Sequence, residues 1–195
     1  MMRDVPSPRP MRTRPHCETW LKRPPRATVT RKLRPWLTDP ASLTARIRAR
    51  CERFSVKVLR QRLALPHRDE ATLLGLRRGE LAWLREVLLV ADGVPVVFAR
   101  SLLPRANVRG AWNLFHGIGA RPLGAALFAD PAISRRALTC ACLDRRDARY
   151  HLAATAVAPR ALPPRLWARR SLFRLHGRAL LVSETFLPTI LELPE

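Results

Sequence analysis

The sequence predicts an α+β domain built on a mainly antiparallel β-sheet with helices packed on one side. Several segments alternate apolar and polar residues, as strands do. Two pairs of such segments are joined by the dipeptides Asp92-Gly93 and His176-Gly177, and the first of these is typical of a tight hairpin. Few helical patterns separate the strands, which argues against the regular strand–helix alternation of a parallel sheet.

The folded body is expected to begin near Trp36 with a helix and a strand. Residues 38–42 form a helix-start signal, after which Leu43 and Ile47 recur on one helical face. The alternation over residues 54–65 predicts a strand. Polar turn residues over 67–79 predict a connector.

Two hairpins dominate the rest of the chain. Their predicted strands run over residues 81–91 and 94–103, and over 168–175 and 178–187. The last two strands are the most apolar, so we expect them near the centre of the sheet. Between the hairpins we expect two short helical pieces within 107–128, the second begun by Pro122, then weaker strands at 133–143 and 150–157 and a loop at 161–165.

Residues 1–35 differ in composition from the rest. They contain seven of the 18 prolines and ten basic residues, against only Asp4 and Glu18. We expect a basic Pro/Arg-rich extension, disordered or loosely attached, followed by a single domain over 36–195. A targeting peptide is the alternative interpretation of this extension.

Length and hydropathy fit one folded domain. The chain has 195 residues, 47% of them hydrophobic, which suffices for a core. No run approaches the roughly 18 apolar residues of a membrane span, and the N-terminus lacks the apolar segment of a secretory signal. We therefore expect a cytoplasmic protein without a membrane span.

The formal net charge of +21 invites a nucleic-acid interpretation. However, only three of the 36 basic residues are lysines, a skew that GC-rich codon usage produces, and the charges are spread along the chain. We therefore expect no specific nucleic-acid partner, and a positive field that attracts small anions to a pocket.

The residues that commonly bind metals are scattered. Cysteines 17, 51, 140 and 142 form no CxxC pair, and the five histidines show no metal-ligand spacing. Cys140 and Cys142 share one face of a predicted strand, but a tetrahedral site would need two more ligands. We expect no metal site.

Two charged residues lie on strand faces that are otherwise apolar. By alternation, Arg85 shares its face with Trp83 and Val87, and Glu184 shares its face with Phe186. Burying a lone charge is costly unless it is paired or binds a charged ligand. The two residues predict either a pocket for a polar or anionic ligand or a buried ion pair. Trp83 and Phe186 would suit a ring-shaped ligand, or simply pack in the core.

Three blocks of the sequence resemble the chorismate lyase family. They run from Trp83 to Pro104, from Pro122 to Phe128 and from Trp167 to Pro188, and Ser42-Leu43-Thr44 fits the family's early helix. The resemblance spans about residues 36–188 and implies an antiparallel sheet with two loops covering an internal site. The basic extension and the long segment 140–164 depart from the family pattern.

The resemblance also implies a function. The family converts chorismate to 4-hydroxybenzoate and pyruvate, the first committed step of ubiquinone synthesis in many bacteria, without a cofactor. Arg85 is then expected to bind the ring carboxylate together with the backbone of Leu123. Glu184 is expected to meet the ring hydroxyl, and Leu43 to line the pocket where some members have methionine. The expected catalytic residues are Arg85 and Glu184, the latter as a base for the C4 proton or as an orienting acceptor.

Some alternatives remain open at this point. Arg100, Arg169 and Arg170 are all candidates to meet the second carboxylate of chorismate. The fold also resembles the effector-sensing domains of certain bacterial transcription regulators, so a non-catalytic sensor of small aromatic acids is the alternative function. Residues 1–35 are too proline-rich for the helix-turn-helix of such regulators. The expected partners are chorismate and 4-hydroxybenzoate, and the expected state is a monomer.

Overall fold

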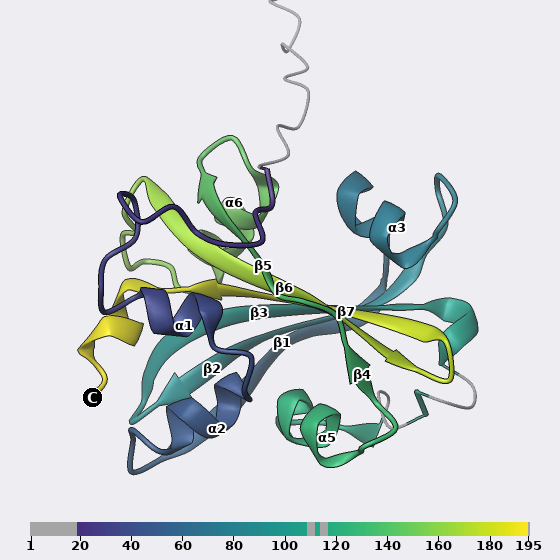
Figure 1. Cartoon of the computed structure of the whole chain (residues 1–195), viewed down its shortest axis with the longest axis horizontal. Helices are drawn as coiled ribbons and strands as arrows, with labels where there is room; N and C mark the ends of the chain where they lie inside the picture. Colours follow the sequence, from purple (N-terminus) through teal and green to yellow (C-terminus); the bar gives the residue numbers. More distant parts are fainter. Residues whose placement is uncertain (1–18, 109–111, 114–116, 195) are drawn as a thin grey trace, which may run out of the picture.

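One seven-stranded antiparallel sheet organises the molecule (Figure 1). The computed structural model describes residues 19–108, 112–113 and 117–194. Within them the strand order is β1-β2-β3-β7-β6-β4, and β5 pairs with β6. The strands are β1 (Phe54–Ala64), β2 (Ala82–Ala91), β3 (Val94–Pro104), β4 (Ser134–Arg135), β5 (Thr139–Asp144), β6 (Arg165–Leu175) and β7 (Arg178–Phe186). The predicted central position of the last hairpin is confirmed for β7, which lies between β3 and β6.

Both predicted hairpin turns are confirmed. The turn between β2 and β3 places Asp92 at φ 49° and Gly93 at φ 81°. The turn between β6 and β7 places His176 at φ 49° and Gly177 at φ 76°. Two consecutive residues with positive φ match the twist of an antiparallel pair, which explains the glycine at each second position.

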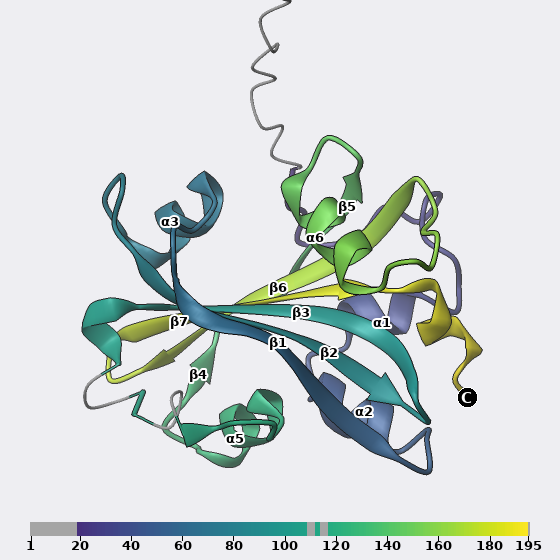
Figure 2. The ribbon, with the colours of Figure 1, turned by 180° about the vertical axis from the view of Figure 1, so that it is seen from behind.

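Short helices cover both faces of the sheet, whereas the sequence predicted one covered face (Figures 1 and 2). Leu102 packs with α3, and its neighbour Leu103 packs with α5 on the opposite face. Helices α1, α2 and α5 lie on the second face, and α3 and α6 on the first. The helices are α1 (Arg34–Thr38), α2 (Leu43–Arg48), α3 (Arg68–Leu74), α5 (Leu123–Ala129) and α6 (Ala148–Ala156), with single turns η1 (Arg105–Asn107) and η2 (Pro188–Glu192).

Two segments were predicted with the wrong secondary structure. The weak strand expected at 150–157 is helix α6. Its first turn is capped by the Asp147 carboxylate, which accepts from the Arg149 backbone N–H at 2.8 Å. The connector expected at 67–79 contains helix α3. Its start is fixed by Glu70, which accepts from the His67 backbone N–H at 2.8 Å, and Gly75 ends it at φ 69°.

The described part of the expected N-terminal extension lies against the domain. Leu21 forms a bridge with Cys140, the Arg170 guanidinium lies 4.0 Å from the centre of the Trp20 ring, and Val29 is buried. Residues 19–35 therefore pack on the domain, and contacts with it begin before the predicted boundary at residue 36. The part of the extension before residue 19 lies outside the described residues, and the expected two-part division of the chain stays a prediction.

Among the described residues, no helix has both the length and the apolar composition to cross a membrane.

Candidate active site

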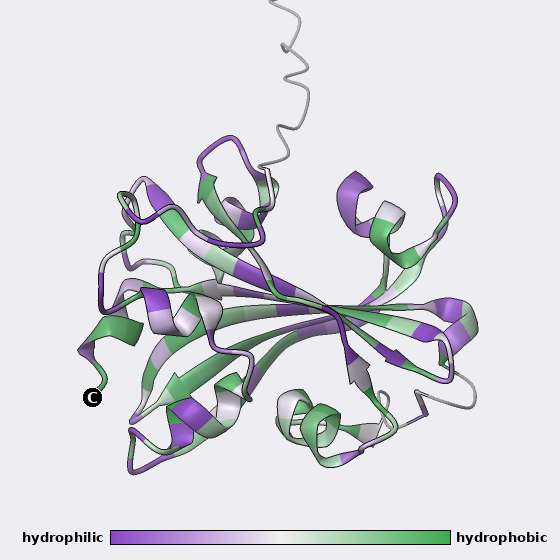
Figure 3. Ribbon diagram, in the orientation of Figure 1, coloured by the Kyte–Doolittle hydropathy of each residue, from purple (hydrophilic) through white to green (hydrophobic). Residues whose placement is uncertain are grey.

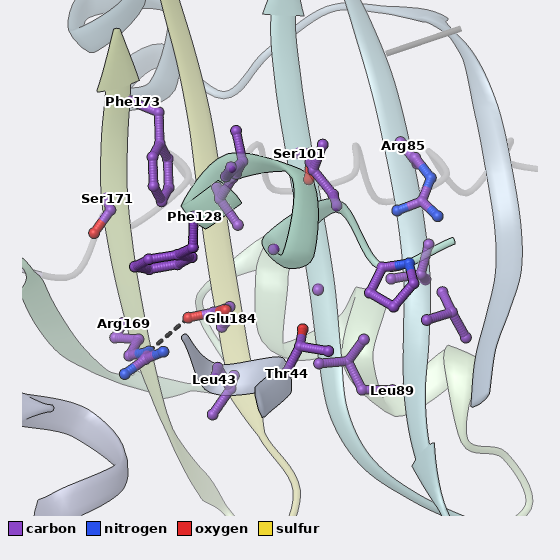
Figure 4. Close-up of a pocket in the computed structure, with 18 of the residues that line it drawn as sticks. Leu43, Thr44, Arg85, Leu89, Ser101, Phe128, Arg169, Ser171, Phe173 and Glu184 are labelled. Carbon is purple, nitrogen blue, oxygen red and sulfur yellow. Dashed lines mark hydrogen bonds and ion pairs between the residues drawn. The ribbon is translucent and has the colours of Figure 1, made fainter. Parts of the chain in front are cut away.

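Two adjacent rows of side chains form the floor of a pocket, on the face of the sheet that carries α2 and α5 (Figure 4). Each row crosses four neighbouring strands in register. The first row is Arg85, Ser101, Val182 and Ser171, and the second is Val87, Ala99, Glu184 and Arg169. Hydrophilic bands interrupt the otherwise hydrophobic central strands (Figure 3).

The two helices α2 and α5 form the roof. Leu43 and Thr44 of α2 and residues 122–124 and 127–128 at α5 line the pocket, whose empty space, including its opening, is about 590 Å³. The helices come close at Gly124, where an added Cβ would lie 3.0 Å from Thr44 Oγ1. Glycine therefore permits the tight contact that closes this roof.

Arg85 is a buried cation without a carboxylate partner in the described structure. The residue is 2% exposed, and its Nη2 donates to the carbonyls of Gly119 at 2.8 Å and Arg121 at 3.3 Å. Its Nε is buried and makes no hydrogen bond to a described group. Burial lowers the pKa of Arg85, because the charged form loses its hydration. The guanidinium thus keeps donor capacity for an anion.

The backbone around Leu123 lies beside this guanidinium. Gly119 and Arg121, which accept from Arg85, lie just before α5, and Leu123 is its first residue. The first backbone N–H groups of a helix have no acceptor within the helix. An anion bound to Arg85 would therefore find backbone donors close by.

Glu184 forms an ion pair within the pocket (Figure 4). Its Oε2 accepts from Arg169 Nε at 2.5 Å. Arg169 also donates from Nη1 to the carbonyls of Trp36 at 2.9 Å and Asp39 at 3.0 Å, which join the sheet to the segment before α2. The interpretation of Arg85 and Glu184 as one buried ion pair is wrong, because each has other partners.

Arg135 is a pocket residue that the sequence did not predict. It lies on the two-residue strand β4, opposite Phe173, and its Nε donates to Ser171 Oγ at 2.8 Å. Its guanidinium lies 5.2 Å from the centre of the Phe128 ring. Burial, as the largest cause, lowers the pKa of Arg135 to about 10 despite the nearby Glu184 carboxylate, so Arg135 is charged at neutral pH.

The four residues named from the sequence, Arg85, Glu184, Leu123 and Leu43, all line this pocket. Of the three candidates for a second carboxylate, Arg169 is in the pocket. Arg100 and Arg170 are not, since they lie on the opposite face of the sheet and pair with carboxylates there. Arg100 pairs with Glu86 at 2.6 Å and Glu70 at 3.2 Å, and Arg170 pairs with Asp69 at 2.6 Å.

Aromatic side chains line the pocket, but not the ones the sequence suggested. Trp83 and Phe186 belong to core clusters on either side and are not among the lining residues, whereas Phe128 and Phe173 are. The rings of Phe128 and Phe173 meet edge to face, with centroids 6.0 Å apart. In the described residues, no group of three or more His, Cys, Asp or Glu side chains is placed to hold a metal ion.

Comparison with known proteins identifies the family. A family model described as chorismate lyase matches residues 15–193. The chain belongs to the chorismate lyase family. It is 79% identical over 184 residues to a protein of Aromatoleum aromaticum named "Probable chorismate pyruvate-lyase", covering 94% of this chain and 100% of that one. A protein of the same name from Azoarcus sp. (strain BH72) is 66% identical over 180 residues, covering 91% and 95% of the two chains.

Solved structures share the fold with this chorismate lyase family member. PhnF from Mycobacterium smegmatis superposes with a TM-score of 0.53 at 20% identity, covering 76% of this chain and 64% of that one. The C-terminal domain of the histidine utilization repressor from Pseudomonas syringae pv. tomato gives a TM-score of 0.51 at 11% identity, covering 70% and 93%. The predicted antiparallel α+β fold is confirmed.

Proposed function

We propose that this protein is a chorismate lyase, which converts chorismate to 4-hydroxybenzoate and pyruvate without a cofactor. The observation that carries the proposal, beside family membership, is a buried guanidinium without a carboxylate partner among the described residues, Arg85, on the same sheet face as Glu184. Such a cation is costly to bury alone and becomes favourable when a carboxylate binds.

Arg85 and Glu184 suit the two ends of the same ring. They stand on β2 and β7, which are separated by β3. Two inter-strand spacings and an offset of two residues along the strand put their backbones roughly 12 Å apart. Arg85 would bind the ring carboxylate, aided by the backbone N–H at Leu123, and Glu184 would accept from the 4-hydroxyl. Leu43 and Phe128 would contact the ring from the roof side.

The reaction breaks the C3–O bond of chorismate and removes the C4 proton, and the ring becomes aromatic. The electron pair of the C3–O bond leaves with the enolpyruvyl oxygen, and the enolpyruvate methylene carbon gains one proton to give pyruvate. The proton lost at C4 balances this proton, so the overall reaction consumes no acid or base. The protein holds the ring in a reactive conformation and stabilises negative charge on the departing oxygen. In this mechanism Glu184 orients the hydroxyl, because Arg169 already holds its Oε2 at 2.5 Å.

A direct assay tests the proposal. Purified protein is incubated with chorismate in the presence of EDTA, and 4-hydroxybenzoate and pyruvate are quantified by chromatography. Equal amounts of both products, formed well above the spontaneous rate, are expected. Tight binding of 4-hydroxybenzoate without turnover would point to the sensor function instead.

We further propose that the enzyme acts as a monomer in the cytoplasm. In support of a monomer, the floor and the roof of the pocket, as far as the structure describes them, both come from a single copy of the chain. Sedimentation equilibrium at assay concentration is expected to give the mass of one chain, 22.1 kDa. Fractionation of cells that express the tagged protein would test the location.

A further inference from the structure

The charges that line the pocket do not cancel. Three guanidinium groups, those of Arg85, Arg135 and Arg169, and one carboxylate, that of Glu184, are the ionised side chains among its described lining residues. Arg169 and Glu184 neutralise each other. Arg85 and Arg135 have no carboxylate within ion-pair distance in the part of the chain that the structure describes. The pocket therefore presents two unpaired cations, which is complementary to a dianion.

Arg135 is held in place by neutral contacts only. Its Nε donates to Ser171 Oγ, its Nη1 donates to the carbonyl of Pro40, and its guanidinium lies 5.2 and 5.3 Å from the ring centres of Phe128 and Phe173. These contacts fix the orientation of the side chain, and none of them is with a carboxylate. Its Nη2 makes no hydrogen bond to a described group, so it can donate to a ligand.

The order of the strands places Arg135 at the correct end of the substrate. Arg85 is on β2, Glu184 is on β7, and Arg135 is on β4, beyond β6. A ring that spans from Arg85 to Glu184 has its C4 hydroxyl at Glu184. The ether oxygen is attached to the neighbouring C3 atom, so the enolpyruvyl carboxylate extends from that same end of the ring, on the side away from Arg85.

We propose that Arg135 binds the carboxylate of the enolpyruvyl group and so selects the dianionic substrate over single-carboxylate aromatics. This inference rests on the proposed lyase function. Arg169 is the weaker candidate, because its Nε is bound to Glu184 and its Nη1 to two backbone carbonyls. Arg135 instead carries a charge that the described residues leave unpaired.

The position of Arg135 at the edge of the pocket supports this role. Arg135 and Phe128 line both the pocket and an adjoining surface groove. The basic residues of that groove are Lys22, Arg23, Arg34, Arg135 and Arg136, and its described lining contains no acidic residue. The enolpyruvyl end of the substrate would thus face a positive opening, through which pyruvate can leave while the aromatic product stays.

Two stable ligands test the proposal. One is 3-(carboxymethoxy)-4-hydroxybenzoate, which carries the ring carboxylate, the hydroxyl and an ether-linked carboxylate but cannot react. The other is 4-hydroxybenzoate, which lacks the second carboxylate. Affinities are measured by titration calorimetry for the wild type, Arg135→Gln, Arg135→Lys and the matched control Arg136→Gln, whose exposed side chain lines the groove but not the pocket.

The wild type is expected to prefer the dicarboxylate. Arg135→Gln should weaken dicarboxylate binding by about tenfold or more, the effect of losing one charge-assisted hydrogen bond, and change 4-hydroxybenzoate binding by less than about twofold. Arg135→Lys should recover part of the preference, and Arg136→Gln should retain all of it. In turnover assays, Arg135→Gln should raise KM for chorismate.

Several outcomes would overturn the assignment. One is an equal loss of affinity for both ligands in Arg135→Gln. Another is a loss of dicarboxylate affinity in Arg136→Gln as large as that in Arg135→Gln. The third is a wild type that binds the dicarboxylate no more tightly than 4-hydroxybenzoate. Failure of the lyase function has a different signature, since the wild type would then bind these ligands but leave chorismate unreacted. If Arg135→Gln does not fold, Arg135→Lys still decides against the wild type and Arg136→Gln, because complete loss of the dicarboxylate preference in Arg135→Lys would exclude recognition of charge.

Discussion

Arg85 and Glu184 lie on one face of the sheet, two strands apart and one row out of line, and no hydrogen bond or ion pair joins them. Arg85 is in the row that crosses β7 at Val182, and Glu184 is in the next row. Glu184 is bound by Arg169 instead, and Arg85 by backbone carbonyls. Arg85 and Glu184 therefore lie on either side of the pocket floor and leave the space between them open.

Replacing Arg85 by methionine is expected to separate stability from function. The change removes a buried charge that has no carboxylate partner among the described residues. The free energy of unfolding should therefore change by no more than about 1 kcal/mol, because removal of the buried charge offsets the loss of the hydrogen bonds to Gly119 and Arg121. Affinity for 4-hydroxybenzoate should fall by roughly tenfold or more, since a charge-assisted hydrogen bond is lost. Urea denaturation and calorimetry measure the two effects. An exposed control, Arg62→Met, should leave ligand affinity unchanged.

The Glu184→Gln variant should lose both stability and turnover. It leaves Arg169, whose side chain is 2% exposed, without its carboxylate partner. Removing one member of a buried pair costs up to about 3–5 kcal/mol, and the remaining amide oxygen of Gln and the partial exposure of Glu184 should reduce that cost. Adding Arg169→Met should restore stability but not activity, which a double-mutant cycle with parallel assays would show. Recovery of turnover in the double variant would contradict the role of Glu184.

Binding of a dicarboxylate should weaken at high pH. Only protonated Arg135 attracts the anion, and its lowered pKa of about 10 means that the proton is lost above that pH. Affinity for 3-(carboxymethoxy)-4-hydroxybenzoate should be constant below about pH 9 and fall as pH rises through 10. Glu184, Arg169 and Asp39 are the charges that act on this group. The phenol of the ligand also ionises in this range, so Arg135→Gln should reduce the dependence to that seen with 4-hydroxybenzoate, which has the same phenol but no second carboxylate. A profile that is the same in the variant would assign the titration to another residue.

Gly124→Ala should loosen the roof. The added methyl group would lie 3.0 Å from Thr44 Oγ1, so the Thr44 side chain, or α2 with it, must move away from α5 by a few tenths of an ångström. We expect faster release of 4-hydroxybenzoate in stopped-flow displacement, with little change in the sheet. Combining it with Thr44→Ala removes the contact atom and should restore slow release. Slow release in Gly124→Ala alone would show that this contact does not control exchange.

The sequence predicted the long strands, the turns and the two inward charges, because alternation over many residues is a local signal. It could not select among Arg100, Arg169 and Arg170, since which face each side chain occupies depends on cross-strand register. Ala99, and not Arg100, turned out to face Glu184 across β3 and β7.

Other features could not be predicted, because their segments have too short or too ambiguous a sequence pattern. Arg135 stands on a strand of two residues, which has no periodicity to detect. The segment of α6 has both alternating and helical spacing of its apolar residues, and only the Asp147 cap favoured the helix. The signals for α3, by contrast, were present in the sequence, since His67, Glu70 and Gly75 mark its two ends.

The three arginines of the pocket also fasten its cover. Arg85 donates to the carbonyls of Gly119 and Arg121, Arg169 to those of Trp36 and Asp39, and Arg135 to that of Pro40. Each acceptor lies in a segment that leads into a roof helix. The arginines that attract the anion therefore also hold the segments before α2 and α5 in place. The positive charge of the pocket and the position of its roof thus depend on the same side chains.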